Sequence, residues 1–165
     1  MPNSPDPFDS AVTLAHLIRS QRISSLGTLR QGAPLVSMVL YLPATDFSAF
    51  YLHVSRLAWH TQDMLADTRV SLSIAATDSG TRDPQTLERV SIRGEALAIE
   101  NDVAGHAALK AQWLMRFPAS AINFELADFQ FFRIALRDAR FVAGFGRIHN
   151  LSAQALTSAC IDGRI

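Results

Sequence analysis

Hydrophobic and polar residues recur along this chain with two different periods, and these periods predict its elements. Alternation with period two, as over 50–54, is typical of strands, and apolar residues at helical spacing indicate helices. The predicted helices run from Asp9 or Ser10 to about Arg22, from a cap at Ser55 through Leu65, and from Asn101 or Asp102 to about Phe117. The predicted strands cover 23–29, 34–42, 50–54, a segment ending near 76, 87–99, 129–136 and 140–143.

The longest predicted strand, over 87–99, has two distinct faces. Val90, Ile92, Gly94 and Ala96 fall on one face, and mostly polar residues fall on the other. A glycine inside a strand indicates a bulge or bend, which helps a sheet to curl. We therefore expect the sheet to bend at Gly94.

The stretch 50–74 predicts a strand, a tight turn, a short helix and another strand. Ser55 stands where a helix N-cap is expected. Free N–H groups and the helix dipole attract phosphate to a first helical turn, and Arg56, His60 and Thr61 add cations and a hydroxyl. The combination suggests a phosphorylated ligand. The same residues also suit an ordinary capped and solvated helix start, and this stretch alone leaves both readings open.

The length of 165 residues suits one domain. We expect a single domain over 1–165, with a flexible lead-in at 1–8 and a C-terminal tail at 150–165 that is weakly helical at best. Six or seven strands, joined mostly by short turns with helices between them, predict an α+β fold built on a small antiparallel barrel.

Composition narrows the possible partners. Only 18% of the residues are charged, and the formal net charge is zero. A low charge fraction indicates a large interface, so we expect a homo-oligomer. The chain has no basic stripe, and nucleic acid is therefore not expected as a partner.

Several features argue against other classes of protein. The single cysteine, Cys160, excludes an intrachain disulfide and a cysteine-rich zinc site. The five histidines show no metal-binding spacing, so no metal site is expected. The opening MPNSPDPFDS lacks the pattern of a signal peptide, and no apolar stretch is long enough to span a bilayer. We expect a cytoplasmic protein without a membrane partner.

Four segments, in order, carry a family resemblance. They are SSLGTLRQGAPLVSMVLYL, SRLAWHTQDMLAD, DPQTLERVSIRGEA and ADFQFFRIALRDARFVAGFGR. Together they resemble the pyridoxamine 5'-phosphate oxidase-like FMN-binding split barrels, and within them the branch associated with haem-iron utilisation. The resemblance covers roughly residues 20–148. Asp63 stands where the branch commonly has Asn, and Thr68 where it commonly has Pro.

The resemblance implies a homodimeric split barrel that binds FMN at the subunit interface. Carried over by motif, Ser55, His60 and Thr61 would hold the phosphate beside Leu57, with Arg56 or Arg89 supplying positive charge. An FMN phosphate carries nearly two negative charges, and charge-assisted hydrogen bonds are the stronger kind.

Two further contacts with the flavin follow from the resemblance. The backbone of Ser37, Met38 and Val39 would run along the flavin ring. Arg89 would face the pyrimidine end or the ribityl chain, where a cation stabilises the reduced flavin. An exposed sheet arginine is the alternative for Arg89.

Three residues near the end of the resemblance are candidates for contact with a substrate or with haem. Asp128 is expected at a strand start, and Arg147 ends a glycine-rich turn that would close over the cleft. His149 is either a haem ligand or a histidine of the tail, and the sequence favours the tail.

The leading hypothesis from sequence is an FMN-dependent oxidoreductase whose catalytic residues and substrate are unknown. The first alternative is a protein that binds or degrades haem on the same barrel without FMN. The second is a flavin-binding module without turnover.

Overall fold

The computed structural model describes residues 7–101 and 103–162. Their elements are α1 (Pro7–Ser20), β1 (Ile23–Arg30), β2 (Ala33–Leu40), β3 (Leu42–Pro43), β4 (Ala49–Ser55), α2 (Trp59–Ala66), β5 (Arg69–Ala75), η1 (Pro84–Thr86), β6 (Arg89–Ile99), α3 (His106–Arg116), η2 (Pro118–Glu125), β7 (Phe129–Val142), β8 (Ile148–Ser152) and α4 (Ala153–Asp162). Most of the expected lead-in, residues 1–6, and the possible cap Asp102 lie outside the described residues.

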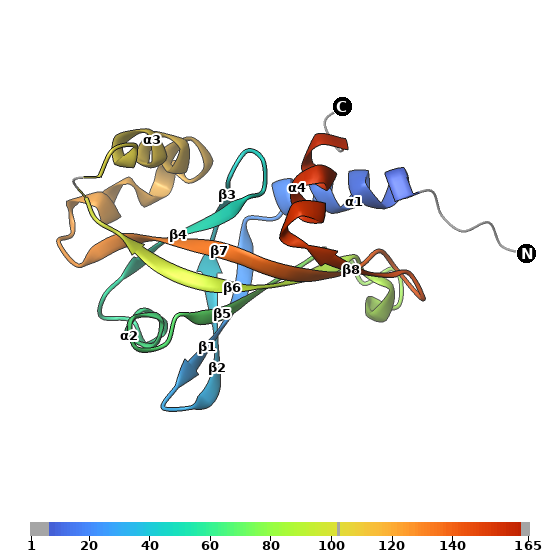
Figure 1. The fold of residues 1–165 in the computed structure, drawn as a ribbon, viewed down its shortest axis with the longest axis horizontal. Helices are drawn as coiled ribbons and strands as arrows, with labels where there is room; N and C mark the ends of the chain where they lie inside the picture. The colour runs from blue at the N-terminus through green and yellow to red at the C-terminus, as the bar shows by residue number, and fades with distance from the viewer. Residues whose placement is uncertain (1–6, 102, 163–165) are drawn as a thin grey trace, which may run out of the picture.

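A single curled antiparallel sheet forms the body of the protein (Figure 1). Seven of its strands follow the order β2-β1-β5-β6-β7-β4-β3, and β8 pairs with β7 outside this path. The expected α+β class and the antiparallel barrel are confirmed. The described residues contain eight strands where six or seven were expected, because β3 and β8 are too short to show a clear alternation in sequence.

The C-terminal segment differs from the expected weakly helical tail. Residues 148–152 form β8 along the end of β7, and α4 packs against α1 above the sheet (Figure 1). Leu156, Ala159 and Cys160 of α4 are buried in the main core. The two expected strands 129–136 and 140–143 are one continuous strand, β7.

The bend expected at Gly94 is confirmed. Arg93 pairs with Asp138, but Gly94 pairs with Leu136, so Arg137 is an extra residue on β7 opposite this point. Such a bulge bends the strand and increases its twist. The two faces expected for this strand are present: Val90, Ile92 and Ala96 of β6 are buried, while the polar residues between them are exposed.

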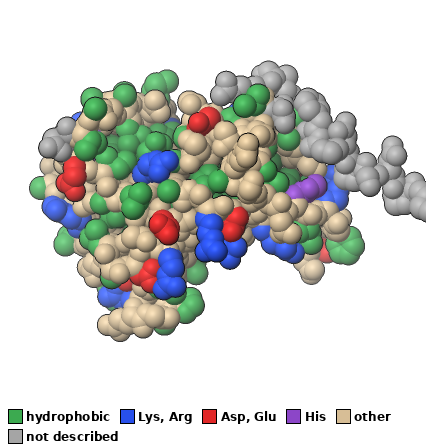
Figure 2. Space-filling model, in the orientation of Figure 1, with side chains coloured by type: hydrophobic (Ala, Val, Ile, Leu, Met, Phe, Trp, Pro, Cys, Tyr) green, Lys and Arg blue, Asp and Glu red, His purple; other side chains and the backbone are tan. Residues whose placement is uncertain are grey.

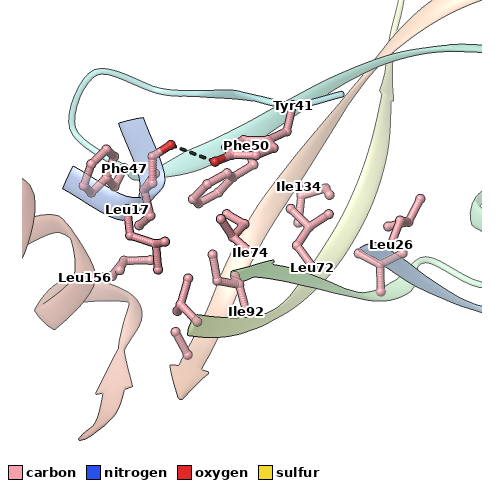
Figure 3. Close-up of a cluster of buried hydrophobic side chains, with 14 of the residues drawn as sticks. Leu17, Leu26, Tyr41, Phe47, Phe50, Leu72, Ile74, Ile92, Ile134 and Leu156 are labelled. Atoms are coloured by element: carbon pink, nitrogen blue, oxygen red, sulfur yellow. Dashed lines mark hydrogen bonds between the residues drawn. The ribbon is translucent and has the colours of Figure 1, made fainter. Parts of the chain in front are cut away.

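The main core lies inside the curl of the sheet (Figure 3). Leu26, Leu72, Ile92 and Ile134, each from a different strand, are at most 1% exposed there. α1 closes the core at one end, where the Tyr41 hydroxyl donates a 2.7 Å hydrogen bond to the backbone oxygen of Ile18 (dashed in Figure 3).

A second, aromatic core lies on the other face of β4. Strand β4 is buried on both faces, because α3 and η2 cover the side that faces away from the barrel. The buried members of this cluster are Leu42, Trp113, Phe117 and Phe131. His53 is stacked on Phe124 with 4.0 Å between ring centroids and is only 9% exposed. Burial, followed by repulsion from His106 and Lys110, lowers the pKa of His53 to about 4.

The surface in Figure 2 mixes charges of both signs. Basic and acidic side chains alternate across the lower half of this face, and hydrophobic side chains lie between them. No helix of the described residues has the length and apolarity that a membrane crossing requires.

The bulge gives a test of the fold. A Cβ added at Gly94 would lie 2.3 Å from the carbonyl oxygen of Ala135, so a rigid strand would have to move. We expect Gly94→Ala to lower the free energy of unfolding by about 2 kcal/mol or more, measured by chemical denaturation. Gly27→Ala is the matched control, because its Cβ would meet only the rotatable hydroxyl of Ser71 below 3.0 Å. An equal loss in both variants would contradict this role for Gly94.

The buried histidine predicts a pH dependence of stability. His53 has a pKa of about 4 in the folded chain and about 6.5 when unfolded, so the unfolded chain binds more protons between these values. Stability should therefore be complete above about pH 6.5 and fall by about 3 kcal/mol as the pH drops to about 4.

The matched variant for this pH dependence is His53→Phe, which keeps an aromatic ring in the cluster. The two pKa values define the range to be measured, roughly pH 4 to 7.5. As the pH is lowered through this range, the denaturation midpoint should fall less steeply in His53→Phe than in the original chain. Identical slopes would show that His53 does not carry the effect.

Candidate functional site

The turn after β4 is built differently from the expected capped helix. Helix α2 begins at Trp59 and has Ala58 as its N-cap, with no capping hydrogen bond from a side chain. The Ser55 hydroxyl instead accepts a 3.1 Å hydrogen bond from the N–H of Leu57 and donates to the carboxylate of Asp128. The expectation that Ser55 caps the helix is therefore wrong, because α2 begins only at Trp59 and the Ser55 hydroxyl makes its hydrogen bonds within the preceding turn.

Arg56 ties the same turn to the segment that precedes β7. Its backbone N–H donates to the Asp128 backbone oxygen at 2.8 Å, and its guanidinium donates to the Ala127 oxygen, also at 2.8 Å. These bonds arise because Ser55 pairs with Phe129 at the end of the β4–β7 ladder. Asp128 therefore lies at a strand start, as expected, and contacts the predicted phosphate turn.

The first turn of α2 carries the remaining predicted phosphate ligands. Trp59 and His60 occupy its first positions, where backbone N–H groups have no partner within the helix. Thr61 is fully buried, and its hydroxyl has no hydrogen-bond partner among the described residues. Burial lowers the pKa of His60, and the nearby Asp63 opposes this shift. His60 therefore tends toward its neutral form, so the expected cation is weaker than a charged histidine would be.

A buried acid, Asp63, connects α2 to the sheet. Its carboxylate accepts hydrogen bonds from the Thr28 hydroxyl at 3.0 Å and from Arg30 at 2.9 Å. The Arg30 guanidinium lies 4.2 Å from the ring centre of Trp59. Sequence reasoning missed this cluster, since only the departure from the usual Asn marked position 63, and the partners lie more than thirty residues away along the chain.

Ser37, Met38 and Val39 lie on β2, which packs near α2. Val39 is buried, while the Met38 side chain is 68% exposed. β2 stands at one end of the strand order and pairs only with β1 among the described strands. One backbone edge of this strand is therefore open to a ligand or a partner chain.

Arg89 does not lie near the α2 turn of the same chain. It pairs with Val142 at one end of β7, whereas Ser55 pairs with Phe129 at the other. The thirteen intervening steps along β7 correspond to roughly 40 Å. The Arg89 guanidinium donates to the backbone oxygens of Gln85 and Leu87, each at 3.0 Å. Within one chain, the two arginines proposed for the phosphate are therefore separated.

Arg147 and His149 also lie at this far end. Arg147 donates to the Ala143 backbone oxygen across the glycine turn. His149 is on β8, opposite Phe141, and its ring lies 6.0 Å from that of Phe141. The tail favoured for His149 is a strand at this point, because residues 148–152 return along β7 as β8.

His149 lines a cavity of about 340 Å³ beneath α1 and α4. The cavity is mostly apolar, and its lining residues are Ser10, Ala11, Leu14, Phe141, His149, Leu151, Ala155, Ser158 and Ala159. The Nε2 atom of His149 and the hydroxyl of Ser10 are buried without a hydrogen-bond partner among the described residues. Few buried polar atoms remain unpaired in native proteins, so this nitrogen is available for a ligand.

Apart from Ser37, Met38 and Val39 on β2, the predicted site residues thus form two groups at opposite ends of β7. The α2 end offers N–H groups, a buried hydroxyl and an arginine, which suit an oxyanion. The β8 end offers an imidazole nitrogen in an apolar cavity, which suits an axial ligand to the metal of a macrocycle such as haem. Within the described residues, no three His, Cys, Asp or Glu side chains are grouped closely enough to hold a metal ion.

The chain is similar to proteins of a known family. Residues 5–157 match the model of a family described as CREG, beta-barrel. The chain is 35% identical over 125 residues to the non-canonical heme oxygenase HOZ, chloroplastic, of Arabidopsis thaliana. That match covers 74% of this chain and 36% of the plant protein, so the chain spans about a third of its relative's length.

Solved structures share the fold. A heme binding protein from Mycobacterium smegmatis has a TM-score of 0.80 and 28% identity, covering 94% of this chain and 61% of that one. A FAD-binding protein from Mesorhizobium loti has a TM-score of 0.62 and 20% identity, covering 78% of this chain and 89% of that one. At this lower identity the likeness concerns the fold alone.

Proposed function

This chain belongs to the CREG β-barrel family, and from that premise we propose that it is a haem-binding protein of the haem-utilisation type. The resemblance of its motifs to the split barrels and their haem-utilisation branch is confirmed at the level of the family and the fold. Haem binding and any turnover by this chain remain proposals, as does the FMN-dependent oxidoreductase expected from sequence.

The observation that carries the proposal is the unpaired nitrogen of His149. A neutral imidazole is a common axial ligand of haem iron. Here its Nε2 atom is buried and has no partner among the described residues, and Phe141 and Leu151 form apolar walls beside it. An imidazole nitrogen among apolar side chains is one of the ligand arrangements that hold haem iron.

The size of the cavity adds a condition. About 340 Å³ lies at the small end of the range for ligand pockets, roughly 300–1,000 Å³. We therefore expect α4 to shift away from α1 when a macrocycle enters. Bound haem would supply iron for binding or activating oxygen, while this chain's residues would hold the iron through His149 and exclude water with their apolar walls.

FMN is the second candidate, and the α2 end supports it. The first-turn N–H groups of α2 and the buried Thr61 hydroxyl suit a phosphate. The open edge of β2 at Ser37, Met38 and Val39 suits the edge of a flavin ring. A relative in the same fold is named as FAD-binding.

Two features of the α2 end weaken the FMN proposal relative to haem. The Ser55 hydroxyl is already bound to the carboxylate of Asp128, which brings a negative charge beside the proposed phosphate. The Arg56 guanidinium is held by the Ala127 backbone oxygen. A flavin phosphate would have to break these bonds or be held mainly by backbone N–H groups.

We also propose that the chain forms a homodimer through the face that includes β2. Val36 and Met38 are 69% and 68% exposed there, and Ile23 on the neighbouring β1 is 52% exposed. A second copy covering these side chains would remove apolar surface from water. Sedimentation equilibrium should therefore give the mass of two chains.

A cytoplasmic location stays a prediction; the Arabidopsis relative is named as chloroplastic.

Separate titrations of the purified protein with haemin and with FMN distinguish the two candidates. We expect haemin to give a saturable Soret shift, and His149→Ala to weaken its binding by roughly tenfold or more, because the iron loses its axial nitrogen. If FMN binds instead, flavin fluorescence is quenched, and Thr61→Val weakens this binding while His149→Ala leaves it unchanged.

The control for the haemin titration is His16→Ala, which removes a different histidine, one that lies on the exposed side of α1. A Soret shift that survives in His149→Ala with unchanged affinity would overturn the role of His149. Absence of both haemin and FMN binding would overturn the proposed function as a whole.

A further inference from the structure

We propose that a small oxyanion, the carboxylate or phosphate group of a small molecule, binds in the cavity between α3 and η2. This cavity of about 270 Å³ shares no lining residue with the cavity of His149 and is lined in part by the segment 124–127 that precedes β7. Its lining residues are His53, Asn101, His106, Lys110, Phe124, Glu125, Leu126, Ala127 and Phe129.

The buried member of this lining, His53, has an unused polar atom. His53 is only 9% exposed, and its Nδ1 atom has no hydrogen-bond partner among the described residues. The rings of Phe124 and Phe131 hold it in place, with centroids at 4.0 and 4.6 Å. Leaving a buried polar nitrogen unpaired is costly, and a ligand oxygen that reaches it from the cavity would relieve this cost by accepting a hydrogen bond from Nδ1–H.

One cation, Lys110, lines the same cavity. Lys110 is the only lysine in the chain, and its ammonium lies 4.8 Å from the ring centre of Phe124. His106 opens helix α3, whose N-cap Gly105 provides no side-chain cap. The positive end of the α3 dipole therefore points into the region of Lys110 and His106. Burial first, and then the proximity of His106 and Lys110, lower the pKa of His53.

The groups that face His53 favour an anion over other ligands. Lys110 and His106 come from α3, while η2 contributes one acid, Glu125, which is exposed. An anion would pair with Lys110 and accept a hydrogen bond from the Nδ1–H group of His53, whereas a cation would be repelled. Charge-assisted bonds of this kind are the stronger hydrogen bonds. The small volume suits a single carboxylate or phosphate with a short substituent, held against the aromatic wall.

The single lysine makes a direct test available. Isotope-labelled lysine would give one side-chain NMR signal, that of Lys110. Labelled histidine would give ring-nitrogen signals from five histidines, and those of His53 are the ones that disappear in His53→Phe. We expect inorganic phosphate or acetate at tens of millimolar to shift the Lys110 signal saturably and to raise the pKa of His53, since the anion stabilises its charged form. A response to phosphate alone identifies a phosphate group, and a response to acetate identifies a carboxylate. No response to either anion would overturn the proposal.

Charge variants complete the test. Lys110→Gln should weaken anion binding by roughly tenfold or more, and Lys110→Arg should restore most of it, because the positive charge returns. Arg137→Gln, which removes an exposed cation from the bulge of β7, is the matched control and should leave binding unchanged. Equal loss in Lys110→Gln and Arg137→Gln would indicate only a general effect of net charge and would overturn the site.

The test is independent of the proposed cofactors. The readouts come from the chain without haem or flavin: the Lys110 and His53 signals in the original chain and in Arg137→Gln, and the His53 signal alone in the two Lys110 variants. The haemin titration should be the same in Lys110→Gln as in the original chain, because His149 lies at the other end of β7. Failure of haem binding would therefore leave the anion result standing, and the reverse is equally true.

Discussion

Pairing along β7 is the constraint on which both ends of this protein depend. β6 pairs with one edge of β7 over nearly its whole length, while the other edge is divided between β4 and β8. β4 takes residues 129–135 and β8 takes residues 138–142, and the extra residue Arg137 lies in the gap. The same strand therefore holds the Ser55 turn at its beginning and His149 at its end. Any shift in the register of β7 would move both groups of candidate ligands.

The strands could be predicted from sequence wherever one face is buried and the other is solvated. The alternation in 87–99 predicted the two faces of β6, and Gly94 predicted the bend. A glycine is needed at this position because the carbonyl of Ala135 leaves no room for a side chain. The C-terminal elements could not be predicted in this way. β8 spans only five residues, and α4 shows its apolar face only once α1 is known to lie beside it.

The candidate site was predicted in part for a related reason. The motif that contains Ser55 correctly located a turn and a helix. Local sequence could not show that the Ser55 hydroxyl donates its hydrogen bond to Asp128, which lies seventy-three residues away along the chain. His53 was hidden for a similar reason. Its strand is covered on both faces, so the two-residue period no longer separates a core side from a solvent side. Contacts between distant segments decide which polar groups are committed and which remain available for a ligand.

The division of one strand edge between two partners has an evolutionary consequence. The ladder with β4 ends at Ala135 and the ladder with β8 begins at Asp138, with the bulge at Arg137 between them. A substitution near Phe129 can therefore change the chemistry at the α2 end without disturbing the ladder that carries His149. Each end can therefore gain or lose a ligand by independent drift while the barrel persists. A lineage built on such a scaffold can exchange one prosthetic group for another in small steps, each of which leaves a folded protein on which selection can act.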